Sequence, residues 1–186
     1  MYYNKSLKEY LDDLSKKLPA PGGGSASALV GGLGVSLLNM AINFTLGKPS
    51  YKRYEKELKK ILKDLEDLRN RFLKLVDEDV KAYKSKDIWQ ALEVPLKIAQ
   101  ACFSAIKLCP SLLKKTNPNL ISDIACGSIF LEAGFFGAYF NVEANLKFIK
   151  DKKITTKIRK EILQKAKIVK NIRRKMEEEI GTIIRR

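Results

Sequence analysis

The sequence of 186 residues contains no histidine, one tryptophan and three cysteines. Without an imidazole, the chain cannot use histidine acid–base catalysis, a Ser-His-Asp triad or the usual zinc sites. Cys102, Cys109 and Cys126 fit neither a disulfide framework nor a Cys-x-x-Cys pair, so we expect buried thiols in the reducing cytoplasm. Residues 1–18 are charged throughout and predict no secretory signal.

Alternating strand patterns and low-complexity linkers are also missing, whereas helical periodicity is widespread. The capping box Ser6-Leu7-Lys8-Glu9 predicts a short helix that ends by Pro19. Further helices are predicted at 25–46, 51–86, 88–115 with a bend or break at Pro110, 122–150 and from 155 or 156 onward, with caps at Ser122 or Asp123 and at Thr155 or Thr156. We therefore predict one all-α domain over residues 1–186, a bundle of about five to six helices.

Charge is absent between Lys17 and Lys48, and residues 25–46 are long enough to cross a bilayer. The Gly, Ala and Ser content of this segment and its lack of aromatic belts favour a helix buried in a soluble assembly, with no membrane partner. The net charge of +15 is concentrated in residues 147–186, with 15 basic and 5 acidic residues. This stretch fits a solvated helix face or a polyanion-binding surface. Phe148 is its lone aromatic residue, so nucleic acid is the less favoured partner.

Small residues recur every four positions in the uncharged segment, and the same face continues through two amides. They are Gly24, Ala28, Gly32 and Ser36, followed by Asn39 and Asn43. Such a stripe predicts close helix packing, most simply across a symmetric dimer, with Asn43 as a candidate ligand-binding residue. A second stripe of small residues and then amides comprises Gly127, Gly134, Ala138, Asn141 and Asn145.

One carboxylate falls on an apolar helix face. The stripe Leu65, Leu68, Phe72 and Leu75 continues at helical spacing to Asp79. Desolvation there would raise the pKa of Asp79 toward the range of a general acid or base, and a buried salt bridge is the alternative. The neighbouring Asp77 and Glu78 lie off this face and are predicted to be solvated.

A glycine-rich turn, Pro19-Ala20-Pro21-Gly22-Gly23-Gly24-Ser25, precedes the uncharged helix. Successive backbone amides at a helix N-terminus can bind an anion. The turn lacks the Gly-Lys-Ser/Thr of a P-loop and follows no strand, so it is not a nucleotide fingerprint. A tight turn without a ligand remains the alternative.

Several segments together resemble one known family, the cyclodeaminase/cyclohydrolase family. This family comprises the C-terminal domain of formiminotransferase-cyclodeaminase and free-standing methenyltetrahydrofolate cyclohydrolases. The matching segments are residues 6–11, the turn 19–26, residues 40–45 with Gly47, Lys48 and Tyr51, residues 77–80 with Ala82 and Tyr83, Val94-Pro95-Leu96, residues 117–120 with Ser122 and Asp123, and residues 141–146.

The resemblance implies an all-helical homodimer that acts on one-carbon-substituted tetrahydrofolate, with no further cofactor and no metal. One family activity hydrolyses 5,10-methenyltetrahydrofolate to 10-formyltetrahydrofolate. The other cyclises 5-formiminotetrahydrofolate to the methenyl compound and expels ammonia. Both pass through a tetrahedral carbon between two nitrogens and need proton transfer. The hydrolysis is slightly favoured, since no formiminotransferase domain is attached.

The candidate site residues divide into groups that move protons and groups that hold the substrate. Asp79 is expected to relay protons or position water, and Asp123 to pair with the pterin or act as a second acid–base group. Lys48 and Tyr51 are expected to orient the folate or supply a proton. The substrate-holding groups are the amides of Gly22, Gly23, Gly24 and Ser25, for a carboxylate or oxyanion, and the side chains of Asn43 and Asn145, for the pterin ring.

The connection over residues 84–93 departs from the family, whose members usually carry a longer one. Two other interpretations therefore stay open: a relative that binds folate without turnover, and a basic helical binding module whose C-terminal helix meets a polyanion.

Overall fold

The computed structural model describes residues 1–185, and every regular element among them is helical. This confirms the predicted all-α class. The α-helices are α1 (Leu7–Ser15), α2 (Gly23–Asn43), α3 (Glu55–Ser85), α4 (Ile88–Ile106), α5 (Cys109–Lys115), α6 (Ile121–Leu146) and α7 (Lys152–Ile184), joined by the 3₁₀ turns η1 (Tyr2–Asn4), η2 (Pro49–Tyr54) and η3 (Pro118–Leu120). The prediction treated α4 and α5 as one helix that bends or breaks at Pro110. Counted in that way, the described residues form six α-helices, which agrees with the predicted five to six.

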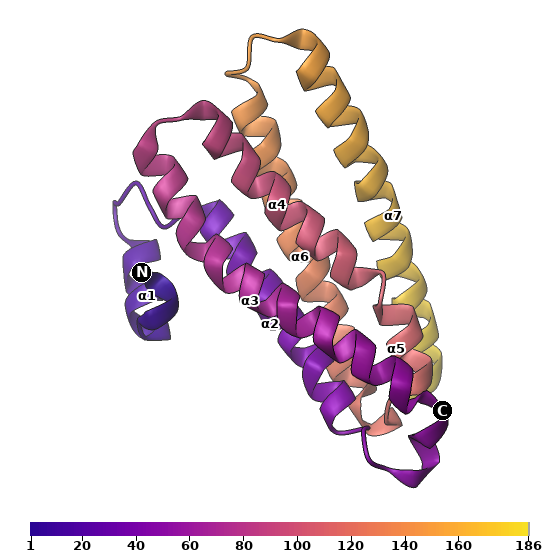
Figure 1. Ribbon diagram of the computed structural model, residues 1–186. Coiled ribbons are helices and arrows are strands. Elements are labelled where there is room, and N and C mark those ends of the chain that lie inside the picture. The colour runs from indigo at the N-terminus through magenta and orange to yellow at the C-terminus, as the bar shows by residue number, and fades with distance from the viewer. Residues whose placement is uncertain (186) are drawn as a thin grey trace.

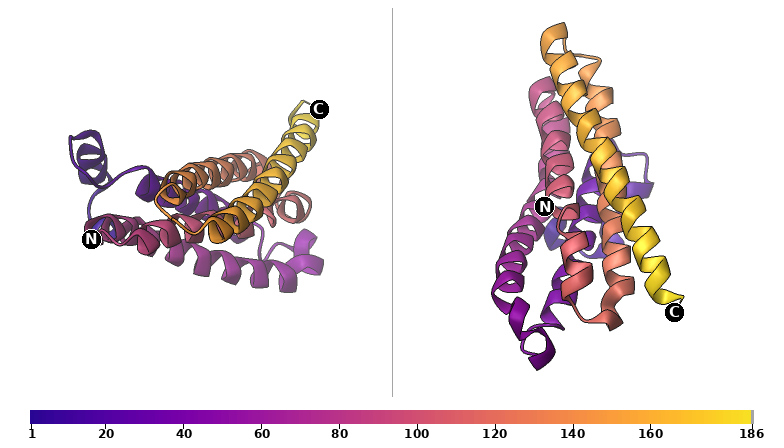
Figure 2. Two further views of the ribbon diagram at one scale, coloured as in Figure 1. Left: turned by 90° about the horizontal axis from the view of Figure 1, so that it is seen from above. Right: turned by 90° about the vertical axis from the view of Figure 1, so that its right-hand side faces the viewer.

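Four long helices, α2, α3, α4 and α6, form the bundle, and α7 packs along its α6 side (Figure 1). The short α1 stands to one side of the bundle, and two further views show α7 running along its length (Figure 2). Apolar side chains at helical spacing fill the centre, among them Leu65 and Phe72 of α3, Ile98 of α4 and Phe135 of α6. The stripe read from the sequence is therefore the core-facing side of α3.

Glycines let α2 and α6 approach backbone to backbone. A Cβ on Gly134 would lie 2.9 Å from the carbonyl oxygen of Ser27, and one on Gly34 would lie 3.0 Å from that of Gly127. The second stripe of small residues thus packs against α2 within the same chain. The first stripe also faces inward in part, since Gly24 and Gly32 meet Asp79 and Phe72 of α3.

Several helix ends differ from the prediction. The cap of α7 is Asp151, whose Oδ1 accepts the N–H groups of Lys153 and Ile154, so the predicted caps Thr155 and Thr156 are wrong. No side chain caps α6, because η3 leads directly into it, and Asp123 lies in its first turn. Each difference moves a helix start by a few residues and leaves the packing unchanged.

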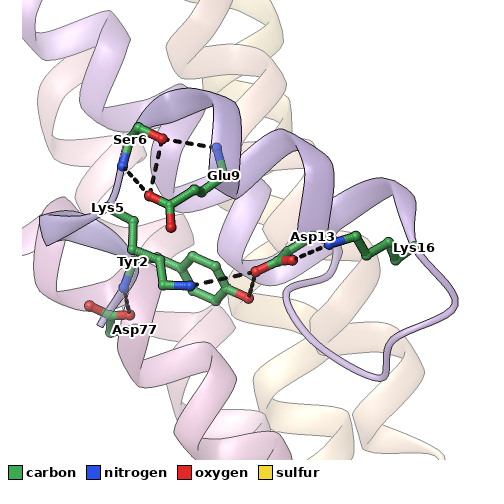
Figure 3. A network of polar contacts seen from close by, with 7 residues as sticks. All are labelled: Tyr2, Lys5, Ser6, Glu9, Asp13, Lys16 and Asp77. Atoms are coloured by element: carbon green, nitrogen blue, oxygen red, sulfur yellow. Dashed lines mark hydrogen bonds and ion pairs between the residues drawn. The ribbon is translucent and has the colours of Figure 1, made fainter.

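Asp77 is buried, and the prediction that it is solvated is wrong (Figure 3). Its Oδ1 accepts the N–H of Tyr2 at 2.6 Å, because η1 folds back over α3 at this point. The Tyr2 hydroxyl donates in turn to Asp13 of α1, which also pairs with Lys16. Backbone donors thus replace the water that we expected around this carboxylate, and they tie the start of the chain to α3.

Three segments are long and apolar enough to cross a membrane: Gly23–Asn43, Ile88–Lys115 and Pro118–Leu146. In the bundle these segments pack against one another and against α3 and α7. These two helices, of 31 and 33 residues, contain many charged residues. Helix α2 is thus covered by protein on the sides that face α3 and α6, while Leu33 on its outer side is exposed.

Gly134→Ala tests the close contact between α2 and α6. The added methyl group meets the Ser27 carbonyl and the Cys102 sulfur, so we expect a loss of about 1–3 kcal/mol in the free energy of unfolding. The matched control is Gly181→Ala in α7, where a Cβ has no neighbour closer than 4.0 Å. Greater helix propensity should stabilise that variant by up to about 1 kcal/mol. Denaturant unfolding measures both, and equal effects would contradict the packing described above.

Candidate active site

The carboxylate of Asp79 lies across the N-terminus of α2. Its Oδ2 accepts the N–H of Ser25 at 2.9 Å, although 54 residues separate the two in sequence. The N-cap residue Gly22 has no side chain to offer, so α3 supplies the cap from outside α2. The anion site predicted at the glycine turn is therefore partly occupied by Asp79 of the same chain.

Gly24 makes this approach possible. A Cβ at Gly24 would overlap the Asp79 carboxylate, whereas one at Gly22 would have no atom within 4 Å. Close approach of the carboxylate, and not an unusual backbone conformation, accounts for glycine at position 24.

Ser25 connects three helices at this point. Its hydroxyl donates to the carbonyl of Val76 in α3 at 3.0 Å and accepts from the hydroxyl of the buried Tyr10 in α1 at 3.1 Å. The Ser25 side chain is fully buried. These bonds fix the start of α2 and, with it, the position of Asp79.

Burial raises the pKa of Asp79 above that of an ordinary aspartate, and the hydrogen bond from the Ser25 N–H opposes the rise. No ion pair involves Asp79 among the described residues, so the buried salt bridge considered as the alternative is absent there. An inward carboxylate without a cation is the kind of environment in which aspartates serve as general acids or bases.

A cavity of about 250 Å³ opens beside Asp79. Its walls come from the glycine turn and from the ends of α3, α4 and α6, namely Pro19, Ala20, Gly22, Gly23, Gly24, Asp79, Ala82, Tyr83, Ala91, Asn141 and Asn145. Backbone N–H groups at a helix start have no intrahelical acceptor, so those of Gly23 and Gly24 are the natural donors here. Within residues 1–185 the wall has no lysine or arginine.

Two amides from the last turns of α6 complete the wall. Asn141 Nδ2 donates to the carbonyl of Gly137 at 2.8 Å, and Asn145 Nδ2 donates to the carbonyl of Ala91 at 2.5 Å. Because both amino groups are engaged with backbone, the amide oxygens are the atoms left with free acceptor capacity. Asn145 was a candidate from the sequence; Asn141 lies one turn earlier on the same stripe and was not assigned to the site.

The remaining candidates lie at the other end of the bundle. Asn43 ends α2, Lys48 and Tyr51 follow it, and Asp123 opens α6. A bond from the Asn117 N–H to Thr45 Oγ1 joins the start of α6 to the end of α2. Since α2 has 21 residues, this end is about 30 Å from the glycine turn. One protomer thus brings together Asp79, Gly22 to Ser25 and Asn145, and it holds the other four residues apart from them.

The short connection between α3 and α4 is a tight turn. Lys86 adopts a left-handed conformation with φ of 56°, and Asp87 caps α4 by accepting the N–H of Trp89 at 2.8 Å. The turn brings Ala91 into the cavity wall, but residues 84–90 contribute nothing to that wall.

No group of three or more Cys, Asp or Glu side chains able to hold a metal ion occurs in the part of the chain that the structure describes. The polar groups of the cavity wall are the Asp79 carboxylate, the Tyr83 hydroxyl, two amides and the backbone of the glycine turn.

Comparisons with known proteins identify relatives over most of the chain. The formiminotransferase-cyclodeaminase family matches residues 6–87 and 85–164. Methenyltetrahydrofolate cyclohydrolase of Methylorubrum extorquens is 30% identical, over 86% of this chain and 88% of that protein. Rat formimidoyltransferase-cyclodeaminase is 28% identical over 87% of this chain, which spans about a third (35%) of the rat protein. The crystal structure of formiminotetrahydrofolate cyclodeaminase from Thermotoga maritima superposes with a TM-score of 0.84 at 25% identity, covering 98% of this chain and 97% of that one.

Gly24→Ala tests the contact between Asp79 and the start of α2. The new methyl group displaces the carboxylate from the Ser25 N–H, so we expect the free energy of unfolding to fall by about 1–3 kcal/mol. Amide hydrogen exchange at Ser25 should also accelerate. Gly22→Ala is the control for stability, because its backbone is extended and its surroundings are open. Unchanged exchange at Ser25 in Gly24→Ala would refute the contact.

Proposed function

The chain belongs to the formiminotransferase-cyclodeaminase family, and on that premise we propose that it is an enzyme of one-carbon folate metabolism whose reaction takes place in the Asp79 cavity. The substrate is a one-carbon derivative of tetrahydrofolate. The reaction is either hydrolysis of the methenyl bridge or cyclising deamination of the formimino group. The observation that supports this most directly is the inward carboxylate of Asp79 beside the free amides of the glycine turn.

The charge of the cavity suits both substrates. In each, the reacting carbon lies between two nitrogens in an amidine that carries positive charge. The wall offers one carboxylate, two amide oxygens and the Tyr83 hydroxyl and, among residues 1–185, no cationic side chain. In a protein of net charge +15, this is a locally acidic place for a cation.

Asp79 would handle the proton that either reaction moves. As a carboxylate it takes a proton from the water or nitrogen that attacks the carbon, and as an acid it returns the proton to the departing nitrogen. Burial raises the pKa of Asp79, so its acid form persists to a higher pH than that of a solvated aspartate. The N–H groups of Gly23 and Gly24, at the positive end of the α2 dipole, are suited to a ring carbonyl or a developing oxyanion.

Asp79→Asn is the central test of the function. The amide keeps an acceptor for the Ser25 N–H but cannot exchange a proton, so turnover should fall by about 10²–10⁴-fold. Wild-type activity should fall as pH drops through the raised pKa of Asp79, and this fall should be absent in the variant.

The same variant tests the effect of Asp79 on stability. The folded state disfavours ionised Asp79, so the stability that the protonated side chain contributes is lost as pH rises through the raised pKa. The variant should therefore be at least as stable as the wild type at neutral pH.

The assay is the absorbance of methenyltetrahydrofolate, read as decay for hydrolysis and as appearance from the formimino compound for deamination, with correction for the spontaneous reaction. Asp77→Asn is the matched control: it removes the same charge from the same helix, but its side chain accepts from the N–H of Tyr2 rather than facing the cavity. Full activity of Asp79→Asn would rule out the proposed role.

We also propose that the protein acts as a homodimer formed through the outer faces of α2 and α6. These neighbouring helices carry uncharged apolar or small residues on this side. Leu33 and Ser36 of α2 and Cys126, Ile129, Ala133 and Phe140 of α6 are exposed, and Leu29, Leu37, Met40 and Phe130 are half-buried. An uncharged face on a strongly basic protein lets a second copy approach without repulsion. An antiparallel partner would bring the end that holds Lys48, Tyr51 and Asp123 alongside the other copy's Asp79 cavity.

Leu33→Glu places a charge in the middle of this face, where Leu33 is 49% exposed. We expect a monomer in sedimentation velocity, and a loss of turnover because the two ends no longer meet. Leu163→Glu is the control on α7, since Leu163 is similarly exposed at 44% among charged neighbours. A wild-type monomer would refute the dimer, and an active Leu33→Glu monomer would refute the shared site.

A further inference from the structure

Pro95 lies inside α4 and is buried, a position where proline is usually unfavourable. Proline has no N–H, so the carbonyl of Ala91, four residues earlier, loses its helical donor. The proline ring also pushes this carbonyl away from the helix axis. The Ala91 carbonyl, at the wall of the cavity, therefore lacks the N–H that a regular helix would provide at position 95.

Asn145 of α6 satisfies that acceptor from across the cavity. Its Nδ2 lies 2.5 Å from the Ala91 oxygen, and both residues line the cavity. Because a carbonyl can only accept, the amide can adopt only the orientation with its amino group toward Ala91. The Asn145 amide oxygen then remains available to accept a hydrogen bond in the cavity, and the orientation of the amide is fixed.

We propose that Pro95 is a positioning residue for substrate binding. By freeing the Ala91 carbonyl, it locks the Asn145 amide with its oxygen available to an N–H donor of the bound ring. This inference rests on the proposed function, in which the cavity holds a nitrogen heterocycle rich in N–H groups. An N–H at position 95 would draw the Ala91 carbonyl back into the helical pattern, and the Asn145 amide would turn freely.

Pro95→Ala tests the proposal by restoring the missing N–H. We expect about a tenfold rise in KM with little change in kcat, the size of one well-placed hydrogen bond. In an Asn145→Ala background the same change should have no further effect, which a general distortion of α4 would not reproduce. The control is Pro110→Ala, because Pro110 lies in the first turn of α5, where no N–H is needed.

A second measurement does not depend on turnover. Side-chain amide exchange by NMR should show one slowly exchanging Asn145 proton in the wild type and a fast one in Pro95→Ala. If Pro95→Ala does not fold, Asn145→Ala replaces it: alanine removes the amide oxygen offered to the bound ring without adding a charge, so KM should again rise about tenfold.

The outcomes separate the two proposals. A wild-type protein without folate turnover would overturn the proposed function. An active wild type whose folded Pro95→Ala variant keeps the wild-type KM, or loses the same factor with and without Asn145, would overturn the role of Pro95 alone. An unchanged KM in Asn145→Ala would do the same.

Discussion

The hydrogen bond from the Ser25 N–H to the Asp79 carboxylate is the contact on which the site depends. It closes the N-terminus of α2, a helix that has no capping side chain of its own, with a charge from the middle of the chain. Ser25 then carries the connection to Tyr10 and Val76, so α1, α2 and α3 meet at one residue. The carboxylate that we propose moves protons is thereby held by the same bonds that join these helices.

Much of the fold follows from local pattern. The capping box at Ser6 and the apolar stripe of α3 were predictable, because each depends on residues close in sequence or on one helix face. The burial of Asp77 was not, because its partner is the backbone N–H of Tyr2, 75 residues away. The cap at Asp151 was missed for a different reason. Several residues near a helix start can cap it, and only the chain path selects among them.

The inward direction of Asp79 could be predicted from its register on α3, and the glycine turn from its composition. The contact between them could not be predicted, because helical periodicity shows which face of a helix a residue lies on. It does not show where along that helix another helix packs. For the same reason, the sequence did not reveal that Asn43 and Asp123 lie a helix length away from Asp79 within one chain. The bond from Asn145 to the Ala91 carbonyl shows a further limit, because that acceptor is available only through the absence of an N–H at Pro95.

The fit of Gly24 beneath the carboxylate constrains how this chain can evolve. Any side chain at position 24 would occupy the space of the Asp79 oxygens. Loss of Asp79 would remove the obstacle but would also strip α2 of its terminal anion. The two positions are therefore expected to covary, and a descendant with a larger residue at 24 would mark a lineage that has given up the aspartate and its chemistry together.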